Sequence, residues 1–196
     1  ITFDLIDISI VVIKIIESDW SSGRVYQLIS KSFVKEFYRE DPIVSHLSND
    51  SGKFRIYPAG QFFGDSRFAA FGLESIGGYH PAKLNIYNDF LQNTQNAGVL
   101  PVLRMMNAKY IILPDAQRIN HPDLLLEKRG SLRTSRGDIP TAIYKINNYL
   151  PRAWFVKEVI KVEESKIWEK ITSQDYDPLE KAFVYEMVKI KPKELG

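Results

Sequence analysis

Segments with the periodicity of helices and segments with the periodicity of strands alternate along this chain. Apolar residues recur every three or four positions over residues 28–40, which predicts an amphipathic helix. Apolar and polar residues alternate over residues 54–57, and residues 109–113 are almost continuously apolar, which predicts a half-buried strand and a buried strand. Helices interleaved with strands favour an α/β fold, in which helices flank a layered mixed β-sheet. An α+β fold is the alternative.

Residues 124–133 and 139–146 have strand character on either side of a polar turn at residues 135–138, which predicts an antiparallel hairpin. Residues 136–138 read Arg-Gly-Asp, which matches an integrin-recognition tripeptide. Turns select Gly and Asp for backbone reasons, so we interpret this tripeptide as a turn.

The remaining periodic segments predict shorter elements. Residues 81–95 predict a helix with Pro81 at its first position, and residues 101–106 predict a short helix that ends at Asn107. The C-terminal part predicts a strand through Val162, a helix capped by Ser165 and a last strand over residues 182–186.

Composition excludes several classes of function. The chain has 196 residues, of which 44% are hydrophobic and 12% aromatic, so it can bury a substantial core. A net charge of +2 is too small to indicate a nucleic-acid surface, and we predict no nucleic-acid partner. The absence of cysteine excludes disulfides, thiolate metal sites and cysteine nucleophiles. His46, His80 and His121 lie far apart in the sequence, so we predict neither a metal site nor a cofactor.

Residues 1–16 are strongly apolar, but Asp4, Asp7 and Lys14 interrupt them. A membrane span needs about 20 mostly apolar residues, so this segment does not qualify by itself. It is either an edge strand or helix that covers the core, or the trailing end of a membrane helix. We divide the chain into a lead-in segment, residues 1–20, and a single α/β domain, residues 21–196. The chain starts without methionine and stops directly after a strand-like run, which indicates a piece of a longer protein.

Residues 72–84 form the candidate binding loop, because paired glycines, a carboxylate, a histidine and a lysine lie here between a strand-like and a helix-like segment. Gly77 and Gly78 permit positive φ or a close approach to another group, and Pro81 suits a helix start. The free N–H groups of a helix start favour an anion such as phosphate. The candidate ligand-binding residues are Glu74, Ser75, Gly77, Gly78, Tyr79, His80 and Lys83. The alternative is a glycine-rich turn that only packs two elements.

Catalytic patterns are weak, and we assign no catalytic residue. Neither a P-loop nor a Gly-x-Gly-x-x-Gly turn is present. Ser75 lacks the first glycine of a Gly-x-Ser-x-Gly elbow. Asp65 and Glu74 are candidates for an acid and base pair, but two carboxylates in one loop are more often surface charges. His80 either titrates near neutral pH or caps the helix.

Several blocks, in order, resemble the soluble region of bacterial YfhO-like multi-spanning membrane proteins, and together they cover roughly residues 54–186. The blocks are Phe54-Arg-Ile-Tyr-Pro58, Gly72-Leu-Glu-Ser-Ile-Gly-Gly-Tyr-His-Pro-Ala-Lys-Leu84, Leu103-Arg-Met-Met-Asn-Ala-Lys-Tyr-Ile-Ile112, Leu150-Pro-Arg-Ala-Trp-Phe-Val156 and residues 177–186. That family is similar to lipid-linked-sugar-dependent glycosyltransferases of the membrane-embedded C superfamily.

The resemblance implies that residues 1–20 are a membrane-proximal lead-in and that residues 21–196 are a non-catalytic domain on the extracytoplasmic face of the cell membrane. Its partners would be the membrane-embedded remainder of the same polypeptide, a polyprenyl-phosphate sugar donor and an envelope glycan acceptor. Those transferases place their acidic catalytic residues in a loop after the first membrane helix, and this chain contains no such helix or loop. The catalytic carboxylates are therefore expected elsewhere, with His80 and Lys83 close to the donor phosphate or the acceptor.

Two other classes of function stay open. A structural or partner-binding module would use Phe62, Phe63, Phe71 and Tyr79 as exposed aromatic contacts. A self-sufficient soluble hydrolase or transferase would need Asp65, Glu74, Ser75 and His80 to converge.

Overall fold

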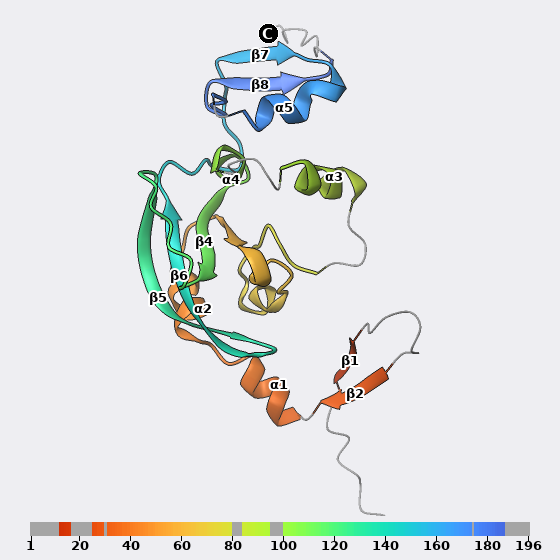
Figure 1. Ribbon diagram of the computed structural model, residues 1–196, viewed down its shortest axis with the longest axis vertical. Helices are drawn as coiled ribbons and strands as arrows, with labels where there is room; N and C mark the ends of the chain where they lie inside the picture. Colours follow the sequence, from red (N-terminus) through yellow and green to blue (C-terminus); the bar gives the residue numbers. More distant parts are fainter. Residues whose placement is uncertain are drawn as a thin grey trace, which may run out of the picture.

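The computed structural model describes residues 12–16, 25–29, 31–79, 84–94, 100–173 and 175–186, with side chains from residue 32 onward within these ranges. Its centre is a four-stranded sheet in the order β3-β4-β6-β5 (Figure 1). The strands are β3 (Arg55–Pro58), β4 (Ala108–Pro114), β5 (Leu124–Thr134) and β6 (Gly137–Ile146). β3 runs parallel to β4, and the other two pairs are antiparallel. The predicted α/β class with a mixed sheet and an antiparallel hairpin is confirmed.

The β5–β6 hairpin closes tightly at its tip. Thr134 pairs with Gly137, so Ser135 and Arg136 form the connection. Gly137 has φ +114°, a conformation that side-chain-bearing residues rarely adopt. The Thr134 hydroxyl accepts from the Arg136 N–H at 3.1 Å and donates to the Gly137 carbonyl at 2.8 Å. The positive φ of this turn therefore explains the glycine of the Arg-Gly-Asp tripeptide.

One face of the sheet packs on helix α2 (Pro42–Ser48), which follows α1 (Lys31–Phe37). Ile43, Val44 and Leu47 are fully buried on α2, at the spacing of one helical face. Gly130 of β5 lets the helix approach, because a Cβ there would lie 3.2 Å from the Cβ of Pro42.

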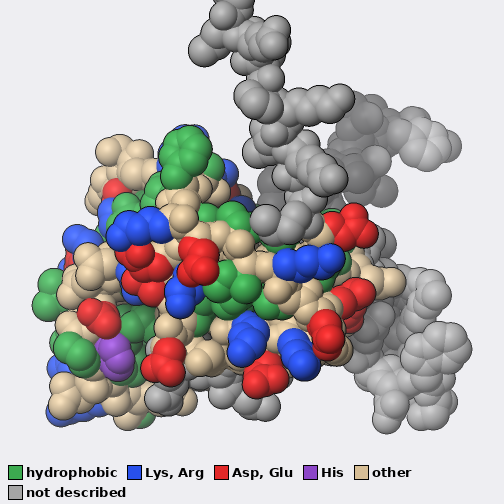
Figure 2. Space-filling model, turned by 90° about the horizontal axis from the view of Figure 1, so that it is seen from above, with side chains coloured by type: hydrophobic (Ala, Val, Ile, Leu, Met, Phe, Trp, Pro, Cys, Tyr) green, Lys and Arg blue, Asp and Glu red, His purple; other side chains and the backbone are tan. Residues whose placement is uncertain are grey.

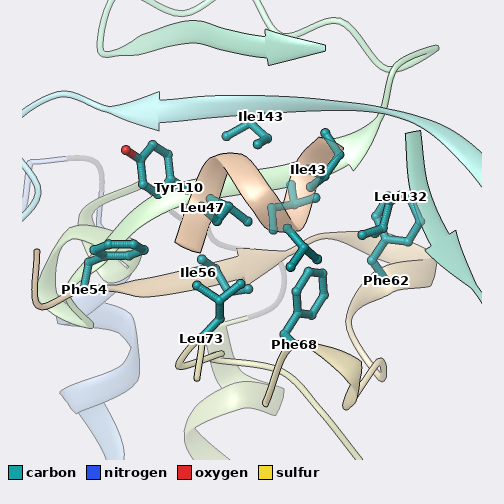
Figure 3. Close-up of a cluster of buried hydrophobic side chains, with 12 residues drawn as sticks. Ile43, Leu47, Phe54, Ile56, Phe62, Phe68, Leu73, Tyr110, Leu132 and Ile143 are labelled. Carbon is teal, nitrogen blue, oxygen red and sulfur yellow. The ribbon is translucent and has the colours of Figure 1, made fainter. Parts of the chain in front are cut away.

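Two apolar layers sandwich the sheet. The layer on the α2 side contains Ile43, Val44, Leu47, Phe54, Ile56, Phe62, Phe68, Leu73, Tyr110, Ile112, Leu132 and Ile143 (Figure 3). The other layer contains Ile76, Leu103, Ala108, Ile111, Leu113, Ala142, Tyr144 and Ile146. Alternate residues of β4 and β6 enter opposite layers, as the pleat of a strand requires.

Helix α4 (Leu100–Met105) matches the predicted short helix. Asn107 follows it with φ +62°, and its side-chain amide donates to the Leu150 carbonyl at 2.8 Å. The predicted turn at Asn107 is therefore confirmed, and it leads directly into β4.

Two predicted helix boundaries are wrong. The first part of the predicted helix over residues 28–40 belongs to strand β2 (Val25–Ile29), which pairs antiparallel with β1 (Val12–Ile16). The pairing partner overrides a local helical spacing. Helix α3 (Asn85–Thr94) begins four residues later than Pro81, because the first helical bonds, from the Tyr87 and Asn88 N–H groups, reach the Leu84 carbonyl. Pro81 itself lies outside the described residues.

The C-terminal part forms a parallel β–α–β unit (Figure 1). Strands β7 (Glu158–Lys161) and β8 (Lys181–Val184) flank η3 (Glu164–Lys166) and α5 (Ile167–Ile171). Ser165 lies within η3 and makes no capping hydrogen bond, so the predicted cap is wrong. The Trp154 indole N–H donates to the Pro178 carbonyl at 2.7 Å, which fixes the chain where it enters β7.

No helix among the described residues combines the length and the apolar character that a membrane crossing requires. The assignment of residues 1–20 as a lead-in stays a prediction.

Candidate functional site

A pocket of about 960 Å³ lies beside the β3 edge of the sheet. Its wall includes Glu74, Ser75, Gly77, Gly78 and Tyr79 of the predicted binding loop. His80 and Lys83, the other predicted site residues, lie outside the described residues. The part of the predicted site that the structure describes therefore faces one pocket.

The connection from β3 to this loop folds into two short 3₁₀ turns, η1 (Gly60–Phe62) and η2 (Arg67–Phe71). Phe62 and Phe68 point into the core from these turns (Figure 3). Because Phe62 is only 1% exposed, it cannot serve as the exposed aromatic contact that a partner-binding module was expected to use. Phe63 and Phe71 are half-buried, whereas Tyr79 is 66% exposed.

The loop attaches to the sheet as a short extra strand. The Ile56 N–H donates to the Glu74 carbonyl at 2.8 Å, and the Ile76 N–H donates to the Ile56 carbonyl at 3.0 Å. This parallel bridge places the Glu74 side chain at the pocket and sends Ile76 into the core.

Backbone geometry requires both members of the glycine pair, Gly77 and Gly78. A Cβ on Gly77 would lie 2.2 Å from the Phe63 carbonyl oxygen, so only glycine fits. Gly78 has φ +113°, and its N–H donates to the same carbonyl at 2.6 Å. The predicted close approach and positive φ are both confirmed. The glycines shape the pocket wall, which the packing interpretation of this loop also explains.

Side-chain hydroxyls tie the rest of the loop in place. The Ser66 hydroxyl accepts from the Tyr79 N–H at 3.1 Å, and the Tyr87 hydroxyl donates to the Ile76 carbonyl at 2.5 Å. The Ser75 hydroxyl accepts from the Gly77 N–H at 3.1 Å, as in a local serine turn. Ser75 thus supports the turn and shows no elbow geometry.

Glu74 is an acidic side chain of the pocket wall, and two arginines flank its carboxylate. The Arg152 guanidinium donates to its carboxylate, and Arg55 Nε lies 3.9 Å from the same oxygen. Arg55 is oriented by a second bond, from Nη1 to the Met106 carbonyl at 3.0 Å. The hydrogen bond from Arg152 lowers the pKa of Glu74, and the positive charges of Arg152, Arg55 and Lys53 lower it further. Glu74 is therefore ionised at neutral pH and unsuited to act as a general acid.

Sequence reasoning missed Arg55 and Arg152. They lie nearly 100 positions apart and far from residues 72–84 in the chain, and neither belongs to a short motif. The sequence signal that could have found these two arginines is that they belong to the blocks 54–58 and 150–156, which carry the family resemblance. Only the fold brings them to one carboxylate.

The pocket combines an apolar wall with a few polar groups. Phe68, Leu73, Ile76 and Met106 supply apolar surface, and the exposed ring of Tyr79 lies at the rim. Small-molecule sites commonly have this composition, with polar groups that fix the orientation of the ligand. Lys and Arg side chains are interspersed with Asp and Glu over the face shown in Figure 2, so no region of a single sign dominates that face.

Metal chemistry has no support in the described ranges, which contain no group of three His, Asp or Glu side chains placed to hold a metal ion. The nearest partners of Glu74 are cations, which compete with a metal for its carboxylate.

No family model matches the chain, and neither does any curated protein or solved structure.

Proposed function

We propose that this chain is a non-catalytic, extracytoplasmic domain of a multi-spanning membrane protein that resembles lipid-linked-sugar-dependent glycosyltransferases. Its role is to hold the glycan acceptor or the sugar of the polyprenyl-phosphate donor in the pocket of residues 72–79. The observation that carries this proposal is the pairing of Glu74 with Arg152 beside an exposed aromatic rim.

The chemistry of this pocket suits a sugar. Hydroxyl groups both donate and accept hydrogen bonds, so a fixed carboxylate next to a fixed guanidinium can bind two neighbouring hydroxyls of one ring. The apolar faces of sugar rings pack against aromatic side chains, and Tyr79 presents such a ring at the rim. Because Glu74 and Arg152 already orient each other, little side-chain freedom is lost on binding.

The distribution of the site over the chain also supports the proposal. Arg55, Glu74, Met106 and Arg152 come from successive blocks of the resemblance to YfhO-like proteins, and hydrogen bonds and ion pairs link them around the Glu74 carboxylate. A shared binding task accounts for blocks that are widely separated in sequence.

The hydrolase alternative is less well supported. The Ser75 hydroxyl takes part in a turn, and the pKa of Glu74 is lowered by Arg152, whereas a general acid needs a raised pKa. We therefore assign the pocket to binding.

The test measures the binding of sugars to this chain by saturation-transfer NMR and titration calorimetry. The probes are monosaccharides and disaccharides of glucose, N-acetylglucosamine and mannose, and a citronellyl-phosphate-linked sugar as a short donor analogue. We expect millimolar binding of at least one probe, weakened about tenfold or more by Glu74→Gln or Arg152→Ala, because a hydrogen bond to a charged group contributes about 1.5–3 kcal/mol.

The control variant is Glu180→Gln. It removes a carboxylate that is paired with Lys157 at 2.8 Å and is exposed to a similar degree, outside the pocket. Equal losses from Glu74→Gln and Glu180→Gln, or the absence of binding by every probe, would contradict the proposal.

A partner-binding role is the second candidate, since Tyr79, Leu84 and Ile86 expose 66%, 72% and 72% of their surface near one another in sequence. Exposed apolar side chains of this size are common at protein interfaces. One variant distinguishes the two candidate functions. Ile86→Ser removes an exposed apolar group that does not line the pocket, so it would abolish partner binding and leave sugar binding unchanged.

A further inference from the structure

A second pocket adjoins the first. It has a volume of about 500 Å³ and lies between the end of α1, the η1–η2 connection and the tip of the β5–β6 hairpin. Asp65 and Ser66 line both pockets, so the two hollows meet at these residues. The first pocket alone is at the upper end of the volumes that hold a drug-sized molecule, which is about 300–1,000 Å³.

The second pocket shares with the first an exposed aromatic ring and an arginine side chain. Its lining includes the half-exposed ring of Tyr38 and the polar side chains of Gln61, Thr134, Ser135 and Arg136. Arg136 is exposed, and no hydrogen bond or ion pair joins its guanidinium to a described side chain. An aromatic ring next to a cation and hydroxyl groups is again suited to a sugar ring.

Arg67, which also lines the second pocket, has a structural role. Its guanidinium donates to the Phe37 and Arg39 carbonyls and to the Asp41 carboxylate, at 2.7, 2.6 and 2.6 Å. Arg67 is buried, and each of its three guanidinium nitrogens donates to one of these groups. The residues available to contact a ligand in this pocket are therefore those of the hairpin tip and Tyr38.

We propose that a single linear oligosaccharide occupies both pockets and crosses the surface of Asp65 and Ser66 between them. This inference rests on the proposed function and adds that the substrate is an extended chain and not a monosaccharide. The Ser66 hydroxyl makes hydrogen bonds with the Tyr79 backbone at the crossing point. These bonds fix the position of Ser66 between the two pockets.

A chain that contacts two connected pockets binds more tightly than a fragment that contacts one, because the second contact forms within the same complex. The experiment is therefore a length series. β-1,4-linked N-acetylglucosamine, α-1,4-linked glucose and β-1,4-linked mannose, each of one to six residues, are titrated against this chain by calorimetry. We expect the affinity in one series to rise at least tenfold between the disaccharide and the longer chains, with one oligosaccharide bound per chain.

Variants of the second pocket separate the two contributions. Arg136→Ala and Tyr38→Ala should lower the affinity of the longest oligosaccharide at least fivefold and leave the affinity of the disaccharide unchanged. Arg118→Ala is the matched control, because it removes an exposed arginine from a loop that lines neither pocket.

The outcomes distinguish this inference from the proposed function. Binding that does not depend on length, or that Arg136→Ala weakens equally for short and long chains, would overturn the two-pocket proposal and leave a sugar site at Glu74 intact. Binding of no probe in any series would overturn the proposed function and this inference together.

Discussion

Two carboxylate–guanidinium pairs in this molecule have the same chemistry and opposite surroundings. In the pair between α2 and η2, the side chains of Arg67 and Asp41 are 1% and 2% exposed, with Nη1 and Oδ2 2.6 Å apart. In the pair at the pocket, the side chains of Arg152 and Glu74 are 44% and 48% exposed. The first pair holds the fold together, whereas the second keeps its charges within reach of a ligand.

The buried pair joins several elements at once. Asp41 accepts from the Ile43 and Val44 N–H groups at 3.0 and 2.9 Å, which caps α2, and from the Arg133 N–H of β5 at 3.1 Å. The Arg67 guanidinium lies 4.9 Å from the centre of the Phe71 ring. Removing either partner leaves an unpaired charge where water cannot reach it, while the pair at the pocket is already solvated.

The largest effect is expected for Arg67→Met. Loss of one partner of a buried ion pair costs about 3–5 kcal/mol, so the free energy of unfolding should fall by that amount. Urea denaturation followed by circular dichroism measures it. The matched variant Arg152→Met should cost less than about 1 kcal/mol, because exposed pairs contribute little. Similar losses in the two variants would break the comparison.

The second prediction concerns the backbone of the pocket region. Gly77→Ala places a Cβ against the Phe63 carbonyl oxygen, 2.2 Å away before any relaxation, and should destabilise the chain by about 3 kcal/mol. Gly64→Ala is the control, since no atom lies within 4 Å of its Cβ and its φ is not positive. This pair of variants would show that the pocket wall is rigid although its charges are exposed. A neutral Gly77→Ala would contradict that conclusion.

The third prediction uses Asp50, whose burial lies between that of the two pairs. Its side chain is 20% exposed, and it accepts hydrogen bonds from Lys109 and from the Tyr110 hydroxyl. Burial by itself raises the pKa of Asp50, but hydrogen bonds from Lys109, the Gly52 N–H and Tyr110 outweigh it and lower the pKa from 3.8 to about 2.

A carboxyl whose pKa is lower in the folded state stabilises the fold above its unfolded pKa. This contribution, roughly 2 kcal/mol, is lost as the pH falls from about 4 to about 2. Urea denaturation at a series of pH values should show that loss, and Asp50→Asn should remove this part of the pH dependence. If Asp50→Asn lost as much stability between pH 4 and pH 2 as the unmodified chain, the loss would have to come from other carboxyl groups.

The smallest effect on stability is expected for Glu74→Gln. The free energy of unfolding should change by less than about 1 kcal/mol, because the carboxylate and its arginines stay solvated in either state. Thermal denaturation, compared with that of Glu180→Gln, measures the change. A loss as large as that of Arg67→Met would assign Glu74 to the fold instead of the pocket.

Local sequence signals predicted the elements whose structure is decided locally. Helix α4, the turn at Asn107 and the β5–β6 hairpin all follow from short-range spacing and turn residues. The predicted helix over residues 28–40 wrongly includes the last two residues of β2, because their hydrogen bonds go to β1 and not to their own neighbours. The predicted helix cap at Ser165 was also wrong, because Ser165 lies within the 3₁₀ turn η3.

The candidate site was predictable only in part. The glycine pair at residues 77–78 marked the loop, and the structure supplies the reason in the Phe63 carbonyl. The convergence of Arg55 and Arg152 on Glu74 depends on the order of strands in the sheet, which residue spacing does not encode. The buried ion pair of Arg67 could not be predicted from local sequence either, because its partner Asp41 lies 26 positions away.

The bridge between Ile56 and Ser75 also affects how the protein behaves in concentrated solution. Ile56 lies in β3, an outer strand of the central sheet, and its N–H and carbonyl groups are already bonded to residues 74 and 76. An open strand edge invites pairing with other chains and so promotes aggregation. The segment of residues 72–79 that forms the pocket wall thus shields this edge at Ile56, and loosening it, as in Gly77→Ala, should reduce solubility as well as stability.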